Sequence, residues 1–314
     1  MNIKSCALLL LAVGAFLSAP FDAKAKQDNF PRLPGAELLM GYPGSNLMVT
    51  TPSQRWILQE GEGDMGIVPS MSRDGTTIAA ARVHPDIPRV HPILAIATYS
   101  IPDKKWREYK SLAYYGSIAI SPDGSKLAID VPQPGTPEGV HIVIIDLKTG
   151  TETVGPVIGP YRAIGLSWSP DGTRIAYGMN IPLLANGPPL PSAIQILDLE
   201  TGRISKVAKG QAPAWSPSGE WIAYLDSGGR PNRILMVHPD GAGAKVLVTL
   251  PGDERIFHDS APPVWSPDST QLLLNEIDDP DRWTFNIHRL DLATLHLTKK
   301  FKHKAPVYGW AELK

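Results

Sequence analysis

Cysteine is almost absent from this chain of 314 residues. The single cysteine, Cys6, lies in an apolar N-terminal segment that we expect to be removed, so the mature chain would have no disulfide and no thiol chemistry. Cys6 also precedes the apolar core of that segment, where it is badly placed for attachment of a lipid. A mature protein of this size without disulfides has to be stabilised by its hydrophobic core.

Charge is scarce as well, because Asp, Glu, Lys and Arg make up 19% of the chain and the formal net charge is −1. This balance provides no basic face for nucleic acid and no acidic tail. Hydrophobic residues reach 43%, which is enough for a large core and excludes a disordered chain. The 28 glycines and 31 prolines far exceed the usual share of ~12% and favour many turns and few long helices.

The apolar run near the N-terminus is too short to cross a bilayer. It extends over 11 residues, from Ala7 to Leu17, whereas a spanning helix needs ~20. Lys4 precedes it and Ala23-Lys24-Ala25 follows it, which is the pattern of a signal peptide cleaved near Ala25; an uncleaved anchor is the alternative. With no Asn-x-Ser/Thr sequon in the chain, we expect a periplasmic or secreted bacterial envelope protein, at most peripheral to the membrane. Residues 26–34 would then form a leader to a domain over residues 35–314.

A turn motif recurs five times, at intervals of 47 to 50 residues. The copies are Ser72-Arg-Asp-Gly-Thr-Thr-Ile-Ala, Ser121-Pro-Asp-Gly-Ser-Lys-Leu-Ala, Ser169-Pro-Asp-Gly-Thr-Arg-Ile-Ala, Ser216-Pro-Ser-Gly-Glu-Trp-Ile-Ala and Ser266-Pro-Asp-Ser-Thr-Gln-Leu-Leu. A large apolar residue precedes each serine, and Trp310 continues the register: Met71, Ile120, Trp168, Trp215, Trp265 and Trp310. A period of this length is typical of a repeat architecture.

Each copy is predicted to be the turn of a β-hairpin. Proline presets the first corner, aspartate hydrogen-bonds the backbone ahead of it, and glycine takes the positive φ that closes the bend. Further strands follow, as in Ile142-Val-Ile-Ile-Asp-Leu-Lys-Thr-Gly150 with Thr151-Glu-Thr-Val after it. Four antiparallel strands per repeat make one blade of a β-propeller.

The two ends of the chain complete the predicted ring. Three strand-like runs begin the mature domain with no innermost strand before them: Glu37-Leu-Leu-Met, Asn46-Leu-Met-Val-Thr-Thr and Gln54-Arg-Trp-Ile-Leu. The run from Val307 to Trp310 has no partner after it, so we expect it to pair with the N-terminal runs. The prediction is an all-β, six-bladed propeller of four-stranded antiparallel blades, closed by pairing of the N- and C-terminal strands.

The sequence Trp-Ser-Pro-Asp-Gly-x-x-Ile-Ala-Tyr, followed by Ile-x-x-x-Asp-Leu-x-Thr-Gly, resembles the repeat of TolB-like six-bladed propellers over residues 35 to 314. The resemblance implies this fold, but propellers of this type serve many functions. TolB carries a separate α/β domain before its propeller, for which we find no segment here. The resemblance therefore does not imply TolB's partner, a peptidoglycan-associated lipoprotein.

Most of the conspicuous residues have a structural explanation. Asp74, Asp123, Asp171 and Asp268 are expected to form turns, and the tryptophans before the serines are expected to pack between blades. The eight histidines form no pair at metal-ligand spacing, so we expect neither a metal nor a cofactor. The cluster of Asp278, Asp279 and Asp281 is expected to be a solvated turn, with calcium as the alternative.

The predicted binding region is the face opposite the turn motifs. Its loops are long and unequal, such as His84–Pro92, Val131–Gly139 and Ile181–Pro191. Stepping back six residues from the apolar position of each innermost strand places a ring of mostly charged residues at the pore mouth on this face. The predicted site consists of Tyr114, Arg162, Lys209, His258, Asp259 and Lys304. With more cations than anions, this mouth would accept an anionic group.

The sequence favours a monomeric, non-catalytic propeller that binds a protein or envelope component through its loop-rich face. No nucleophile–base pair appears at a recognisable spacing, and there is no Gly-x-Ser-x-Gly elbow. The alternative is a lyase or hydrolase that acts on a saccharide or peptide at the pore mouth, with residues that converge from separate blades.

Overall fold

The structure is a computed structural model in which every regular element of the described residues is a β-strand. It describes residues 36–40, 47–50, 55–59, 69–83, 94–112, 116–132, 139–159, 162–179, 192–226, 232–251, 257, 261–280, 282, 284–303 and 306–312. Within these ranges, no helix has the length and apolar character needed to cross a membrane.

Twenty-four strands form six antiparallel sheets of four strands each. In the first three sheets the strands are β24 (Val307–Glu312), β1 (Ala36–Met40), β2 (Leu47–Thr50) and β3 (Arg55–Gln59); β4 (Ser70–Met71), β5 (Thr77–Val83), β6 (Leu94–Ser100) and β7 (Lys105–Leu112); and β8 (Ile118–Ile120), β9 (Lys126–Pro132), β10 (Val140–Asp146) and β11 (Glu152–Gly159). In the other three they are β12 (Ala163–Trp168), β13 (Arg174–Met179), β14 (Ala193–Asp198) and β15 (Ile204–Lys209); β16 (Gln211–Trp215), β17 (Ile222–Leu225), β18 (Arg233–Val237) and β19 (Lys245–Thr249); and β20 (Val264–Trp265), β21 (Gln271–Asp279), β22 (Thr284–Asp291) and β23 (His296–His303).

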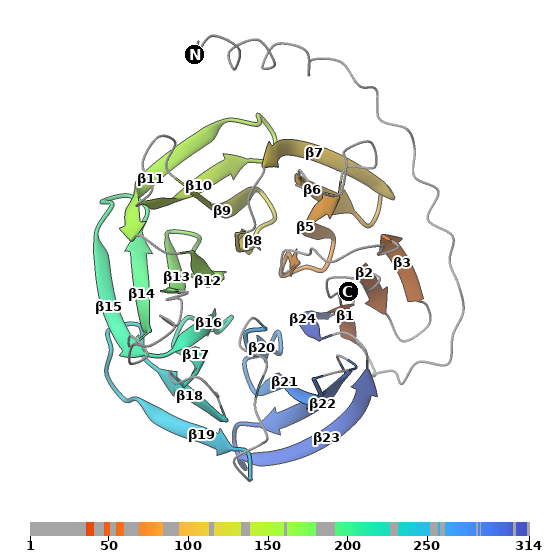
Figure 1. Cartoon of the computed structure of the whole chain (residues 1–314), viewed down its shortest axis with the longest axis vertical. Coiled ribbons are helices and arrows are strands. Elements are labelled where there is room, and N and C mark those ends of the chain that lie inside the picture. The colour runs from red at the N-terminus through yellow and green to blue at the C-terminus, as the bar shows by residue number, and fades with distance from the viewer. Residues whose placement is uncertain are drawn as a thin grey trace, which may run out of the picture.

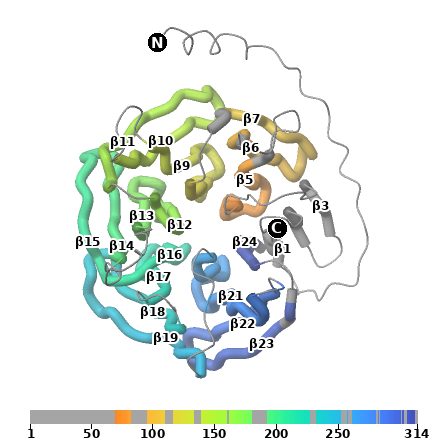
Figure 2. The backbone as a smooth tube through the Cα atoms, viewed as in Figure 1, coloured from red at the N-terminus to blue at the C-terminus, as the bar shows by residue number. Residues whose placement is uncertain are grey.

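The sheets stand like blades around a central channel, which confirms the predicted all-β propeller of four-stranded antiparallel blades (Figures 1 and 2). The innermost strands of the blades are β4, β8, β12, β16, β20 and β24. We name each blade after its innermost strand.

The ring is closed by the two ends of the chain. Strand β24 pairs with β1 in antiparallel fashion, with Leu38 opposite Trp310 and Met40 opposite Val307. The predicted pairing of the C-terminal run with the N-terminal strands is therefore confirmed. Closure gives the innermost strand β24 a partner and removes an open edge at the channel.

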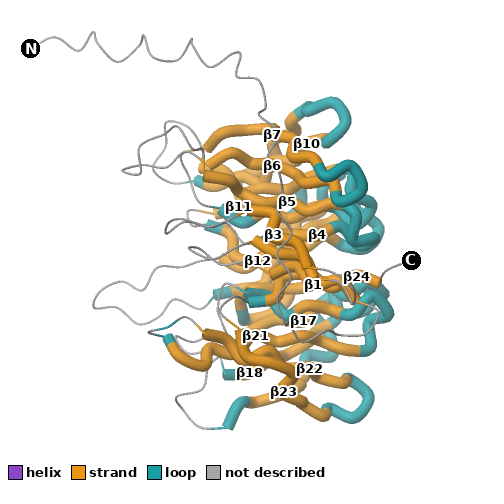
Figure 3. The backbone as a smooth tube through the Cα atoms, turned by 90° about the vertical axis from the view of Figure 1, so that its right-hand side faces the viewer, coloured by secondary structure: helices purple, strands orange, loops and turns teal. Residues whose placement is uncertain are grey.

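The repeated motifs form the turns between the first and second strands of five blades, and they lie on one side of the disc (Figure 3). In blade β12, the Ser169 hydroxyl donates to the Asp171 carboxylate (2.5 Å) and accepts the N–H of Arg174 (2.9 Å). Asp171 also accepts the N–H of Thr173, and Gly172 closes the bend at φ 69°. These contacts confirm that the motif aspartates form turns.

The core lies between neighbouring blades. Trp168, Trp215 and Trp265 are all buried, as predicted, and two of their indole N–H groups reach the preceding blade. The Nε1 of Trp168 donates to the carbonyl of Ala119, and that of Trp265 to the carbonyl of Ala214, each on the innermost strand of the preceding blade. A buried indole thereby contributes a large buried apolar surface while its N–H keeps a hydrogen-bond partner.

Candidate functional site: the turn-side mouth of the central channel

A cavity of about 210 Å³ occupies the central channel at the end formed by the motif turns. Its wall is built from the innermost strands, and its rim from the second residues of the five motifs. These rim residues are Arg73, Pro122, Pro170, Pro217 and Pro267. The repeat thus gathers the same turn position from five blades around one opening.

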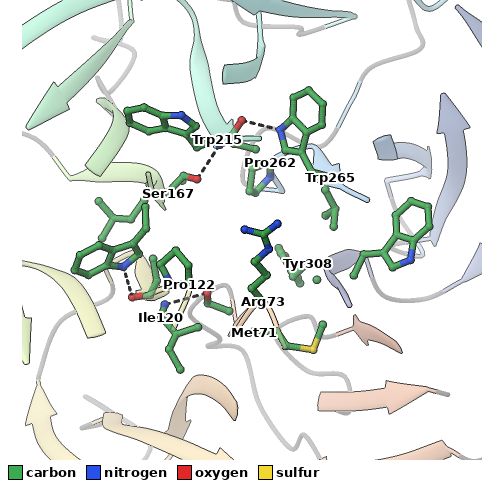
Figure 4. Close-up of a pocket in the computed structure, with 18 of the residues that line it drawn as sticks. Met71, Arg73, Ile120, Pro122, Ser167, Trp215, Pro262, Trp265 and Tyr308 are labelled. Carbon is green, nitrogen blue, oxygen red and sulfur yellow. Dashed lines mark hydrogen bonds between the residues drawn. The ribbon is translucent and has the colours of Figure 1, made fainter. Parts of the chain in front are cut away.

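Arg73 departs from this pattern, because it stands where the other four motifs have proline. It is the only charged residue among the described residues that line the cavity. Its side chain extends over the opening (Figure 4). Its Nη1 donates at 3.5 Å to the carbonyl of Pro217, which belongs to a blade far along the chain. This single bond is long, and the other guanidinium N–H groups have no partner among the described residues.

Five serines among the described residues also line the cavity, and two of them, Ser70 and Ser167, accept a hydrogen bond across blades. The Oγ of Ser70 accepts the N–H of Ile120 (3.1 Å), and the Oγ of Ser167 accepts the N–H of Trp215 (2.9 Å), so each links neighbouring innermost strands. Neither hydroxyl donates to another described residue, and each keeps its own hydrogen for a ligand. Together with Arg73, these hydroxyls make the mouth a site of hydrogen-bond donors.

The charges at the rim are arranged unevenly. The hydroxyl of Ser169 lowers the pKa of Asp171, and that of Ser266 lowers the pKa of Asp268, so the carboxylates that follow the rim residues Pro170 and Pro267 stay ionised at neutral pH. The turn that Arg73 approaches is the exception, since its motif carries Ser218 in place of the aspartate. The guanidinium therefore approaches a motif turn that has no carboxylate at this position, although Glu220 follows two residues later.

Of the residues predicted for the pore mouth on the opposite face, two are described. Arg162 lies directly before the innermost strand β12, half-buried, at the end of the strand away from the motif turn. Lys209 was expected near the entry of an innermost strand, and it lies two residues before β16. It is the last residue of β15, the outermost strand of the preceding blade, where it pairs with Ala193 and is exposed. Tyr114, His258, Asp259 and Lys304 lie outside the described residues, as do most of the three long loops.

Beside Arg162, the carboxylate of Asp130 links two blades. It is 1% exposed, and it accepts the N–H of Ser117 and, at 3.0 Å, that of Ala163, the first residue of β12. Burial raises the pKa of Asp130 to about 7, although these N–H groups and the charge of Arg162 act in the opposite direction. Sequence reasoning missed this residue, whose one signal is an acidic side chain within the apolar run of β9.

A second buried polar group lies in the blade of β20. The Nε2 of His288 is 2.5 Å from the Glu276 carboxylate, and both residues are buried. Asn286 donates to Asp278, which also pairs with Lys302. The pair His288 and Glu276 could exchange a proton, but at 4% and 2% exposure neither presents a surface to a substrate.

The predicted acidic turn is largely paired with cations. Asp278 contacts Lys302, and Asp279 contacts Arg282 at 3.6 Å, while Asp281 lies outside the described residues. Among the residues that the structure describes, no group of three His, Cys, Asp or Glu side chains is placed to hold a metal ion.

The fold defines the chain as a β-propeller, and the solved structures similar to it share that class. TolB from Acinetobacter baumannii matches with a TM-score of 0.62 and 14% identity over 87% of this chain, which spans 66% of that protein. A putative TolB from Agrobacterium tumefaciens matches with a TM-score of 0.59 and 16% identity, covering 87% of this chain and 91% of that one. These likenesses confirm the TolB-like resemblance at the level of the fold.

Solved structures of proteins with other names are similar to this chain as well. A structure of a nidogen–laminin complex matches with a TM-score of 0.63 and 13% identity, covering 88% of this chain and 98% of that one. An oligogalacturonate lyase in complex with manganese matches with a TM-score of 0.51 and 16% identity, covering 90% of this chain and 75% of that one. No protein-family model matches the sequence, and no curated protein matches it significantly.

Proposed function

We propose that this protein is a non-catalytic binding propeller that engages a protein or envelope component at an end of its central channel. The observation that carries the proposal is the chemistry of the described channel wall, where Arg73 is the only charged side chain and no carboxylate or imidazole lines the cavity. Hydroxyls, prolines and buried indoles surround it. Such a wall can hold a ligand, but general acid–base catalysis needs titratable groups that act in pairs.

The fold similarities agree with this proposal. A TolB-like propeller and a propeller found in a nidogen–laminin complex both share this architecture. We further propose that the signal segment directs the mature chain to the periplasm or the outside of the cell. There a rigid disc without disulfides would present its two faces to other envelope components.

The alternative is a lyase or hydrolase for a saccharide or peptide. It is favoured by the similarity to oligogalacturonate lyase and by the pair His288 and Glu276. The burial of this pair argues for a structural role instead, because a substrate has to contact the groups that act on it.

Photo-crosslinking in the native envelope tests the proposal and tells the faces of the disc apart. A photoreactive amino acid is placed at Pro122 on the turn-side rim, at Arg162 near the opposite mouth, and at Glu200 on an exposed outer turn as the control. We expect one stoichiometric partner to crosslink from Pro122 or Arg162 and not from Glu200. Absence of any partner, together with turnover of oligogalacturonate or peptides by the purified protein, would establish the enzyme alternative instead.

A further inference from the structure

We infer that the turn-side mouth of the channel binds the C-terminal carboxylate of a peptide, with the guanidinium of Arg73 as its counter-charge. The inference rests on the proposed binding function and assigns the ligand class and the face. It differs from the sequence prediction, which placed an anion site at the opposite mouth.

The first step of the argument is that Arg73 is a cation at a position with no structural need for one. Four of the five motif turns carry proline here, and the turn of Arg73 forms with the same hydrogen bonds as theirs. The guanidinium has one long bond of 3.5 Å to a backbone carbonyl and no ion pair with a described carboxylate. An arginine held over a cavity with free donors is suited to bind a carboxylate through two N–H groups.

The second step is the pairing of two departures from the repeat across the channel. The motif that lacks proline carries Arg73, and the motif that lacks aspartate carries Ser218, directly after the carbonyl that Arg73 reaches. An aspartate at position 218 would place a carboxylate next to the guanidinium and compete with an incoming anion. The serine removes the carboxylate at this position, whereas Glu220 lies two residues further on and Asp74 lies next to Arg73 in its own turn.

The third step concerns the kind of molecule that brings the carboxylate. A uronic acid ring would bind best between exposed aromatic faces, but Trp168, Trp215 and Trp265 are each only 5% or 6% exposed. The partly exposed aromatic residues of the lining, Tyr308 and Trp310, both belong to β24 and so lie on one side of the channel. The wall instead offers proline rings and the hydroxyls of Ser70 and Ser167. This lining fits a narrow, extended chain whose terminal carboxylate meets Arg73 and the hydroxyl donors.

The test uses the purified protein, immobilised, with two probe libraries of random pentapeptides, one with free C-terminal carboxylates and one with C-terminal amides. Retained peptides are quantified by mass spectrometry. We expect the free-carboxylate library to be retained about tenfold or more over the amidated one, which corresponds to a charge-assisted hydrogen-bonded pair. Equal retention of the two libraries, or no retention of either, would overturn the inference.

Two variants localise the effect. Arg73→Pro restores the residue that the other turns carry and is expected to fold. Ser218→Asp adds the missing carboxylate opposite an unchanged Arg73. Each variant should abolish the preference for peptides with free C-terminal carboxylates. Arg174→Gln is the matched control, because Arg174 lies beside the same turns but already faces Asp171 at 3.9 Å and the ring of Trp215. Thermal melting of each variant shows that it is folded.

The remaining outcomes separate this inference from the proposed function. Retention of trigalacturonate in place of peptides would overturn the assignment to a peptide ligand. A partner that crosslinks from the native envelope at full yield to the Arg73→Pro protein would leave the binding function in place and refute the role of Arg73.

Discussion

Asp130 and Asn275 occupy the same place in two different blades, nine residues after the motif serine, and both hold the next innermost strand by its backbone. Asp130 accepts the N–H of Ala163 at the start of β12, and Asn275 accepts the N–H of Val307 at the start of β24. The other blades have Ala81, Gly178 and Leu225 there. The two polar side chains thus stabilise two particular junctions between blades, and they differ in that one of them titrates.

This difference predicts how stability depends on pH. The pKa of Asp130 is about 7 in the folded protein and ~3.9 in the unfolded chain. The folded state therefore binds the proton more tightly, so the contribution of Asp130 to stability is full below about pH 4 and is lost as the pH rises through 7. Between pH 5 and 8 we expect the free energy of unfolding of the wild type to decrease by roughly 2 kcal/mol because of Asp130. The Asp130→Asn variant should not show this decrease.

Urea unfolding at pH 5, 6, 7 and 8 measures this effect as the difference between wild type and variant, which cancels the contribution of the histidines. Asp171→Asn is the control, because the pKa of Asp171 is lowered and its titration lies below this range. If the free energy of unfolding of Asp130→Asn changed with pH as steeply as that of the wild type, another group would be responsible for the pH dependence.

At the scale of the element, hydrogen bonds from one blade fix where the next innermost strand begins. Asn275 donates to the carbonyl of Val307 at 2.9 Å and accepts its N–H at 2.7 Å, and both residues are buried. In Asn275→Leu both backbone groups of Val307 lose their partner within the core, so we expect a loss of about 2–4 kcal/mol in the free energy of unfolding.

Asn275→Asp separates the hydrogen bonds from packing in the same measurement. A protonated aspartic acid can replace both bonds and an ionised one cannot, so this variant should approach wild-type stability near pH 4 and fall toward Asn275→Leu at pH 8. Equal stability of the leucine variant and the wild type would mean that water or a shift of β24 satisfies Val307.

The elements themselves were largely predictable from the sequence, because each turn carries its own local chemistry. In the predicted turn after Ser266, Ser269 takes the place of glycine at φ 63°, so the rest of the motif was a sufficient signal. An exception is the turn in which Leu295 adopts φ 54° with no glycine to indicate it. The site was less predictable. A fixed step of six residues placed Lys209 near the entry of an innermost strand, and Lys209 lies two residues before β16, but as the last residue of the outermost strand β15.

The residues that matter for chemistry meet across strands and blades, which spacing along the chain does not reveal. His288 and Glu276 come together because β21 and β22 pair in a particular register. Arg73 and Ser218 are separated by 145 positions and approach only because the ring closes. In the sequence both look like minor departures from the repeat.

At the scale of the whole molecule, the fold persists at identities of 13% to 16% with proteins of different function. What these propellers share is a pattern of turns and buried strand faces, which many sequences satisfy. A ring built this way depends on its closure more than on any one blade, since each blade packs against two neighbours and an open ring exposes two apolar faces.

Closure therefore gives the last prediction. Deleting residues 305–314 removes β24, which pairs with β1 and contributes the buried Val307 and Ala311. The first blade then lacks its innermost strand, and Asn275 loses its backbone partner as well. We expect the truncated protein to lose at least several kcal/mol of stability and to melt far below the intact chain or not to fold at all.

The control deletion removes only residues 313–314, which follow the strand, and should melt as the intact protein does. Addition of a synthetic peptide covering residues 305–314 provides the positive test, because it can add the missing strand to the exposed edge of β1. Recovery of the cooperative transition in a peptide-dependent manner would follow from strand closure. A ten-residue truncation that melts like the intact chain would show that the remaining sheets hold the ring without β24.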